Sequence, residues 1–294
     1  MTAANNCRSN AVEEVVQRPA CGEYEASFVS AEGYADHFQM DACPGRCEDA
    51  AMDALHALGV GAVFLLAGGV KGVTGMGLPT VAVSLLGLWM APAQAAALLV
   101  APSLATNVAQ CRGSHWRRLL GMLWPAWLTL ALVTVWAPEV STEPSPIDAH
   151  RLLGSVLVIY GVWGLWRPTL PDLSRQAAWI GAIAGAATGF VTAATSVFVI
   201  PLVAYLQALR LDKDEMVQAL GLSFTVATLA LAARLQASTG LVLLSAQSVL
   251  ALAAAFMGLW LGLAVRNRIS GPAFQRLLFL VFVGLGAANL LRGS

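Results

Sequence analysis

The sequence predicts an all-α polytopic membrane protein made of two inverted repeats, and three observations lead to this fold class. Hydrophobic residues make up 57% of the 294 residues and charged residues only 12%, which leaves too little polar surface for a soluble protein. Long apolar runs without charge or histidine fill the chain after residue 53. Two of these runs are interrupted by glycine and proline at corresponding places.

The apolar runs set the expected helices, because an uncompensated charge in hydrocarbon costs roughly 3 kcal/mol. The two longest runs, 72–111 and 176–209, exceed what one helix needs to cross a core of about 30 Å and must fold back. We expect ten apolar segments, at 55–73, 76–89, 93–110, 119–137, 151–166, 177–193, 196–209, 215–233, 241–265 and 273–291.

The two interruptions define the repeats, 54–167 and 176–292. The first lies between Gly68 and Pro79, and the second runs from Gly181 to Pro201. Corresponding features are separated by about 122 residues, which indicates an internal duplication. Each half is expected to hold one broken, hairpin-like helix pair and three transmembrane helices.

The positions of the basic residues test this membrane topology, because positive charge concentrates on the cytoplasmic side. If each broken pair enters and leaves on one side, the two halves are inverted and the basic residues divide ten to three. We therefore expect external termini and cytoplasmic gaps at 111–118, 167–176 and 266–272. The ten are Arg112, Arg117, Arg118, Arg167, Arg175, Arg210, Lys213, Arg266, Arg268 and Arg276, against Arg151, Arg234 and Arg292.

The leader, residues 1–53, differs from the rest of the chain. It holds ten of the seventeen acidic residues and four of the five cysteines. It has no apolar run long enough to form a core, and we expect it to be disordered. Met52 directly precedes the first apolar segment, so a true start at Met52 is the alternative.

Paired, Gly/Pro-interrupted segments at corresponding positions of two inverted halves point to the substrate site of a secondary transporter, because irregular backbone must line a cavity or pack inside protein. Lys71 is the strongest single candidate for substrate binding, since an intramembrane cation would attract an anion. An interfacial position for Lys71 is the alternative. The candidate substrate-binding residues are Lys71, Gly72, Thr74, Gly75, Gly77, Pro79, Asn107, Gly185, Thr188, Gly189, Thr192, Ser196 and Pro201.

Other readings of the same residues stay open. Glycine four residues apart also fits close helix packing, as with Gly258 and Gly262. The polar residues on the helix after each interruption, such as Asn107 and Thr228, fit interhelical hydrogen bonds. Glu215 stands at a helix start, where an acid favours the positive end of the helix dipole.

Enzyme and nucleic-acid functions find no support in the sequence. No zinc-protease, nucleophile-elbow or Walker motif is present, so we expect no catalytic residue, no metal and no cofactor. The expected partners are a small anionic substrate and the lipid bilayer of the inner cell membrane. A coupling ion and the oligomeric state are left open.

The stretch from Gly69 to Gly77, GVKGVTGMG, resembles the first-half signature of the sulfite exporter (TauE/SafE) family. Residues 201–220 look like the family's second-half stretch, and 258–274 like its C-terminal one. The resemblance covers about 55–292. It implies a two-repeat inner-membrane transporter of sulfite, sulfoacetate or related sulfur and carboxylate anions. The second interruption, from Gly189 to Ser196, is poorer in glycine than the family's pattern.

The function predicted is secondary transport of a small organic or sulfur-containing anion, bound at mid-membrane between the two interruptions. A membrane-embedded enzyme or accessory subunit is one alternative, and an anion channel is another. A channel differs only in lacking alternating access.

Overall fold

The computed structural model describes residues 45–138, 149–166, 171–173, 176–239, 245–266, 268 and 271–292. The chain divides after Pro44 into two units, and all described residues lie in the second. The prediction for the leader therefore falls outside the described residues, except at its end. Residues 45–53 are helical, so the first helix begins ten residues before the expected position.

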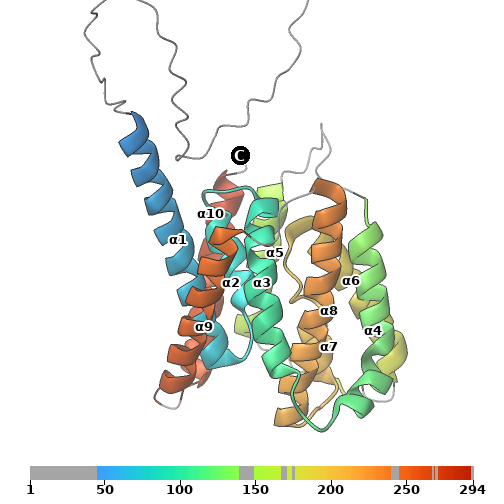
Figure 1. Cartoon of the computed structure of the whole chain (residues 1–294). Helices are drawn as coiled ribbons and strands as arrows, with labels where there is room; N and C mark the ends of the chain where they lie inside the picture. The colour runs from blue at the N-terminus through green and yellow to red at the C-terminus, as the bar shows by residue number, and fades with distance from the viewer. Residues whose placement is uncertain are drawn as a thin grey trace, which may run out of the picture. The chain divides into compact units, whose positions relative to one another are not determined.

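The described part of the chain is all-helical, as predicted, with ten helices and no strand (Figure 1). The helices are α1 (Gly45–Thr74), α2 (Leu78–Leu86), α3 (Pro92–Gln110), α4 (Trp116–Trp136), α5 (Ala149–Trp166), α6 (Ala177–Thr195), α7 (Leu202–Ala208), α8 (Lys213–Thr239), α9 (Ala246–Val265) and α10 (Gly271–Arg292).

Each expected apolar segment overlaps one helix. Apart from the early start of α1, the largest boundary differences are six residues, at the start of α7 and at the end of α8, which continues to Thr239 instead of ending at 233. The segment expected at 196–209 becomes helical only at Leu202. Residues 197–200 are irregular, and the Ile200–Pro201 peptide bond is cis. The sequence pattern did not separate this irregular stretch from the helix because its residues are as apolar as those of α7.

Six helices are long and apolar enough to cross a membrane by length and composition: α1, α4, α6, α8, α9 and α10. The central helix α3 is not among them, and it carries Ser103, Thr106, Asn107 and Gln110. These polar residues lower its hydropathy. The side chains of Ser103, Thr106 and Asn107 are buried, which protects them from lipid.

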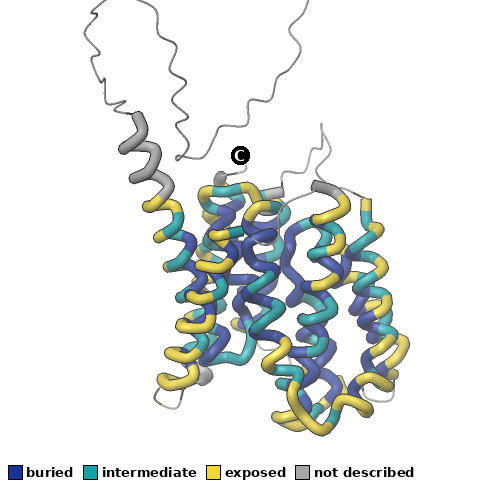
Figure 2. The backbone as a smooth tube through the Cα atoms, in the orientation of Figure 1, coloured by how far each residue is buried: buried dark blue, intermediate teal, exposed yellow. Residues whose placement is uncertain are grey.

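The helices pack so that α3 and α8 contact each other at the centre, with α1 and α9 paired on one side and α4 and α6 paired on the other (Figure 1). The helices α5 and α10 form a further pair. Large apolar side chains such as Trp124, Trp179 and Trp260 are exposed on the outer helices, while the interior positions are buried (Figure 2). An outer surface of apolar side chains is what contact with lipid requires.

Both broken pairs fold back on themselves. A Cβ at Gly59 in α1 would lie 4.0 Å from the Trp89 ring, just beyond α2. In the second pair, the Tyr205 hydroxyl of α7 donates to the Ala177 carbonyl at the start of α6, at 2.7 Å. The beginning of α1 and the end of α10 lie at one end of the bundle, opposite the α3–α4 connection (Figure 1).

Close glycine contacts join the helices that carry the breaks to their neighbours. A Cβ at Gly258 on α9 would collide with the Leu65 carbonyl of α1, and a Cβ at Gly262 with the Gly69 carbonyl. The packing interpretation of Gly258 and Gly262 is thus confirmed. Without side chains, the two backbones approach closely and gain van der Waals contact.

Candidate functional site

The first break follows the last turn of α1. The Thr74 hydroxyl donates to the Val70 carbonyl at 2.8 Å and accepts the Met76 N–H at 3.3 Å. Gly75 and Gly77 have φ of 82° and 99°, a left-handed conformation that glycine adopts without steric cost. The helix therefore ends at this point and α2 starts in a new direction, with Pro79 in its first turn.

Lys71 lies one turn before the break and is 1% exposed. Its Nζ donates to the Thr106 Oγ1 at 3.0 Å and also to the Asn107 Oδ1. Both acceptors are neutral groups of α3, and no carboxylate of the described residues lies within ion-pair distance. An ammonium has three donors, so these two bonds leave one N–H for another acceptor.

The Lys71 contacts continue into a polar network that joins the two halves. The Asn107 amide donates to the Ser103 Oγ at 3.2 Å and to the Thr228 Oγ1 at 3.4 Å. Ser103 and Thr228 also form a hydrogen bond with each other, at 3.2 Å. Since Thr228 belongs to α8, the second half reaches Lys71 through this helix. The expected interhelical bonding of Asn107 and Thr228 is confirmed.

The second break repeats the backbone design of the first without its charge. The Thr195 hydroxyl donates to the Val191 carbonyl at 2.8 Å and accepts the Val197 N–H at 3.3 Å. Ser196, with φ of 61°, occupies the left-handed position. Thr195 and Ser196 therefore correspond to Thr74 and Gly75 at a separation of 121 residues.

This separation pairs residues of the two breaks that the sequence analysis did not pair. Thr192 stands where the first half has Lys71, and its hydroxyl donates within α6 to the Thr188 carbonyl at 2.7 Å. Thr188 in turn donates to the Ala184 carbonyl at 2.7 Å. Both threonines are buried. Thr195 was not among the candidates, although its spacing from Thr74 was available.

Three of the candidate glycines lie at helix contacts rather than at a break. A Cβ at Gly72 would meet the Leu259 carbonyl of α9 at 2.5 Å. A Cβ at Gly185 would collide with the Ala126 carbonyl of α4, and one at Gly189 would lie 2.7 Å from the Leu130 carbonyl. These glycines let α1 and α6 pack closely. Pro201 directly precedes α7.

A cavity of about 290 Å³ lies beside the first break. The break supplies Thr74 and Gly77 to its wall, and α5 and α10 supply the rings of Tyr160, Trp163, Phe279 and Phe282. Thr74 is thus shared between the cavity and the helix turn that carries Lys71. Sequence reasoning missed the aromatic residues because aromatic side chains in a membrane helix resemble ordinary packing or lipid-facing residues.

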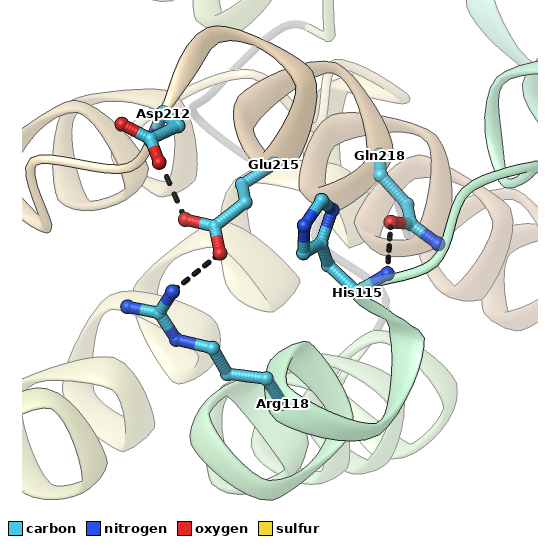
Figure 3. Close-up of polar contacts among 5 residues, drawn as sticks. All are labelled: His115, Arg118, Asp212, Glu215 and Gln218. Atoms are coloured by element: carbon cyan, nitrogen blue, oxygen red, sulfur yellow. Dashed lines mark hydrogen bonds and ion pairs between the residues drawn. The ribbon is translucent and has the colours of Figure 1, made fainter.

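The α3–α4 connection and the first turn of α4 contact the first turns of α8 (Figure 3). Glu215 accepts from Arg118 at 2.5 Å and from the Asp212 N–H at 3.4 Å, so its expected capping role is confirmed. The Gln218 side chain accepts from the His115 N–H at 3.2 Å and donates to the Cys111 carbonyl at 3.1 Å. These contacts join the first half to the second below the polar network.

The molecule is thus a multi-pass helical membrane protein with a buried cation beside a broken helix and a cavity, a site typical of the transporter class. Comparison with protein families places residues 60–289 in the sulfite exporter TauE/SafE family. The chain belongs to this family of membrane transporters of sulfur-containing anions. Comparison with curated proteins and with solved structures gives no match.

Proposed function

We propose that this protein is a secondary transporter of small organic or sulfur-containing anions of the sulfite, sulfonate and carboxylate class. The substrate binds at mid-membrane between the two broken helices. Lys71 supplies the counter-charge and the Gly77 N–H donates a hydrogen bond. The Thr74 hydroxyl donates a further one when it turns away from the Val70 carbonyl. The protein resides in the inner cell membrane.

The observation that carries this proposal is the environment of Lys71. A cation removed from water is costly unless it is paired, yet the described acceptors of Lys71 are the neutral Thr106 and Asn107. An anion arriving at the first break would complete the missing charge pair. The free energy of that pairing favours anions over neutral solutes.

The arrangement of the helices supports an inverted relation between the halves. If α1 to α5 are exchanged with α6 to α10, the α1–α9 contact corresponds to the α6–α4 contact, and α3–α9 corresponds to α8–α4. The α3–α8 and α5–α10 contacts map onto themselves. Such an exchange is what a two-fold axis relating the halves predicts. With that axis in the membrane plane the halves are inverted, the arrangement on which alternating access is commonly built.

The test is a thermal-shift screen of the purified full chain in detergent against sulfite, thiosulfate, methanesulfonate and acetate. A ligand that binds the native state adds to the free energy of unfolding, and it therefore raises the melting temperature, more so at higher ligand concentration.

Proteoliposomes loaded with unlabelled ligand then distinguish a transporter from a channel. Counterflow of labelled ligand against its gradient indicates alternating access, and its absence with fast downhill flux indicates a channel. No shift with any of the anions would contradict the proposal.

A further inference from the structure

The cavity beside the first break has an aromatic wall, which a small inorganic anion such as sulfite does not need. Among the described residues that line it, none is charged. The Tyr160 ring lies 5.4 Å from that of Phe279 and 5.5 Å from that of Phe282, measured between ring centroids. Trp163 stacks on Tyr160 at 6.4 Å. One wall of the cavity is therefore a continuous aromatic surface.

The size of the cavity also exceeds a bare inorganic anion. At about 30 Å³ for each water-sized group, 290 Å³ gives room for roughly ten non-hydrogen atoms. Sulfite has four such atoms and a tightly held hydration shell. A solute with an apolar group fills this volume and removes apolar surface from water.

The polar groups of the cavity lie where an anionic head would be held. Thr74 and Gly77 belong to the break, one turn from Lys71. Gln207 reaches the same cavity from α7, and its side-chain amide has no hydrogen-bond partner among the described residues. An amide N–H is a suitable donor to a sulfonate oxygen. Gln275 of α10 also lines the cavity. The cavity thus offers polar groups from both halves and an aromatic wall from α5 and α10.

We propose that this cavity holds the apolar group of an organic monoanion, a sulfonate bearing a short alkyl or aryl chain, with its head at the first break. This inference rests on the proposed transport function. A second charged group on the substrate would find no charged partner among the described lining residues, and burying an unpaired charge is costly. The site therefore selects against doubly charged anions such as sulfoacetate, and it selects for chain length among monoanions.

The experiment measures dissociation constants of the full chain in detergent for sulfite and for methane-, ethane-, propane- and butanesulfonate. Each added methylene is expected to tighten binding by roughly fourfold until the cavity is full. Propanesulfonate is expected to bind more than tenfold tighter than sulfoacetate, which has a similar length. Alkylammonium ions of the same lengths report partition into detergent and should give no saturable signal.

Two cavity variants and one control variant locate the effect. Trp163→Ala removes part of the aromatic wall and should flatten the dependence on chain length while leaving sulfite binding within twofold. Trp179→Ala is the matched control, because this tryptophan is 73% exposed on α6 and does not line the cavity. It should keep the full dependence. Phe279→Leu keeps an apolar wall, so it tests the cavity even if the alanine variant fails to fold, and it should preserve the methylene gain while weakening benzenesulfonate.

The outcomes separate this inference from the proposed function. Equal affinity for sulfite and all sulfonates, or an unchanged chain-length dependence in folded Trp163→Ala, would overturn the inference and leave anion transport standing. Tighter binding of sulfoacetate than of propanesulfonate would also overturn it. Binding of none of these anions would overturn both.

Discussion

The two breaks share one backbone design and differ in chemistry. Thr74 and Thr195 end their helices with the same pair of hydrogen bonds, and each is followed by a residue in the left-handed conformation. The first break adds Lys71 and its neutral acceptors on α3, whereas the second has Thr192 bonded within its own helix. The comparison teaches that a membrane helix can be broken in the same way with or without a buried charge beside the break. Among the described residues of the two turns, only the first has a lysine, and the second has Thr192 at that position.

The largest expected effect concerns the packing of the helices that carry the breaks. Gly68 and Gly189 are counterparts 121 residues apart, and a Cβ on either would contact a backbone carbonyl of the neighbouring helix, that of Ala255 or of Leu130. Gly68→Ala and Gly189→Ala should each destabilise the protein by about 1–3 kcal/mol through overpacking. The melting temperature in detergent measures this loss.

The matched control is Gly284→Ala on α10, where a Cβ would meet nothing within 4 Å. Alanine has the higher helix propensity, so this variant should melt at the same temperature or slightly higher. A comparable drop in all three variants would show that glycine matters for a reason other than the close helix contacts.

The next effect concerns the charge of Lys71, which distinguishes the first break from the second. Lys71→Gln should weaken sulfite binding by about tenfold or more, because a charge-assisted hydrogen bond contributes roughly 1.5–3 kcal/mol, and folding should be retained. Lys71→Arg keeps the charge in a larger planar group and should retain partial function. Thr192→Val, at the counterpart position, should change the dissociation constant by less than twofold. Ligand-dependent thermal shifts report all three.

Unchanged sulfite binding in Lys71→Gln would remove Lys71 from the site. The break backbone, with Gly75 and Gly77, would then be the remaining candidate. A large loss in Thr192→Val would instead show that both halves contribute directly to the anion site.

A smaller effect is expected from the threonine hydroxyl that ends the helix at each break. Thr74→Val and Thr195→Val keep the side-chain shape and remove the hydrogen bonds that end α1 and α6. Each should lower the free energy of unfolding by about 1 kcal/mol, and the two losses should be similar. Thermal unfolding of both single variants and the double variant measures this, with additive losses expected for distant sites. A loss at only one break would contradict the equivalence of the two turns.

The smallest effect concerns the left-handed residues, where the two variants should have opposite signs. Gly75→Ala places a Cβ in a left-handed conformation and should destabilise by about 1 kcal/mol. Ser196→Gly removes a Cβ from the same conformation and should raise stability by a few tenths of a kcal/mol, because the added chain entropy of glycine offsets part of the gain. Shifts of the melting temperature in the same direction for both variants would show that the two positions are not equivalent.

Much of the fold could be predicted because the membrane imposes a simple rule on sequence. A charge is costly in hydrocarbon, so charge-free runs such as 119–138 mark the helices. The helix α4 begins three residues before its expected start at 119 and ends one residue before its expected end at 137. The early start of α1 at Gly45 was not predicted, since Glu48, Asp49 and Asp53 make that stretch polar. A helix outside the hydrocarbon needs no apolar run.

The sequence by itself determined that the chain is a helical membrane protein with two interrupted segments and a lysine at the first of them. Glycine, proline and charge act locally, so their effects can be read along the chain. The tertiary structure alone decided that Lys71 faces Thr106 and Asn107, that Gly72 contacts α9, and that the rings of Tyr160 and Phe279 meet beside the break. These contacts join residues that are far apart in the chain, and the apolar pattern of a membrane helix does not specify which neighbour each face will meet.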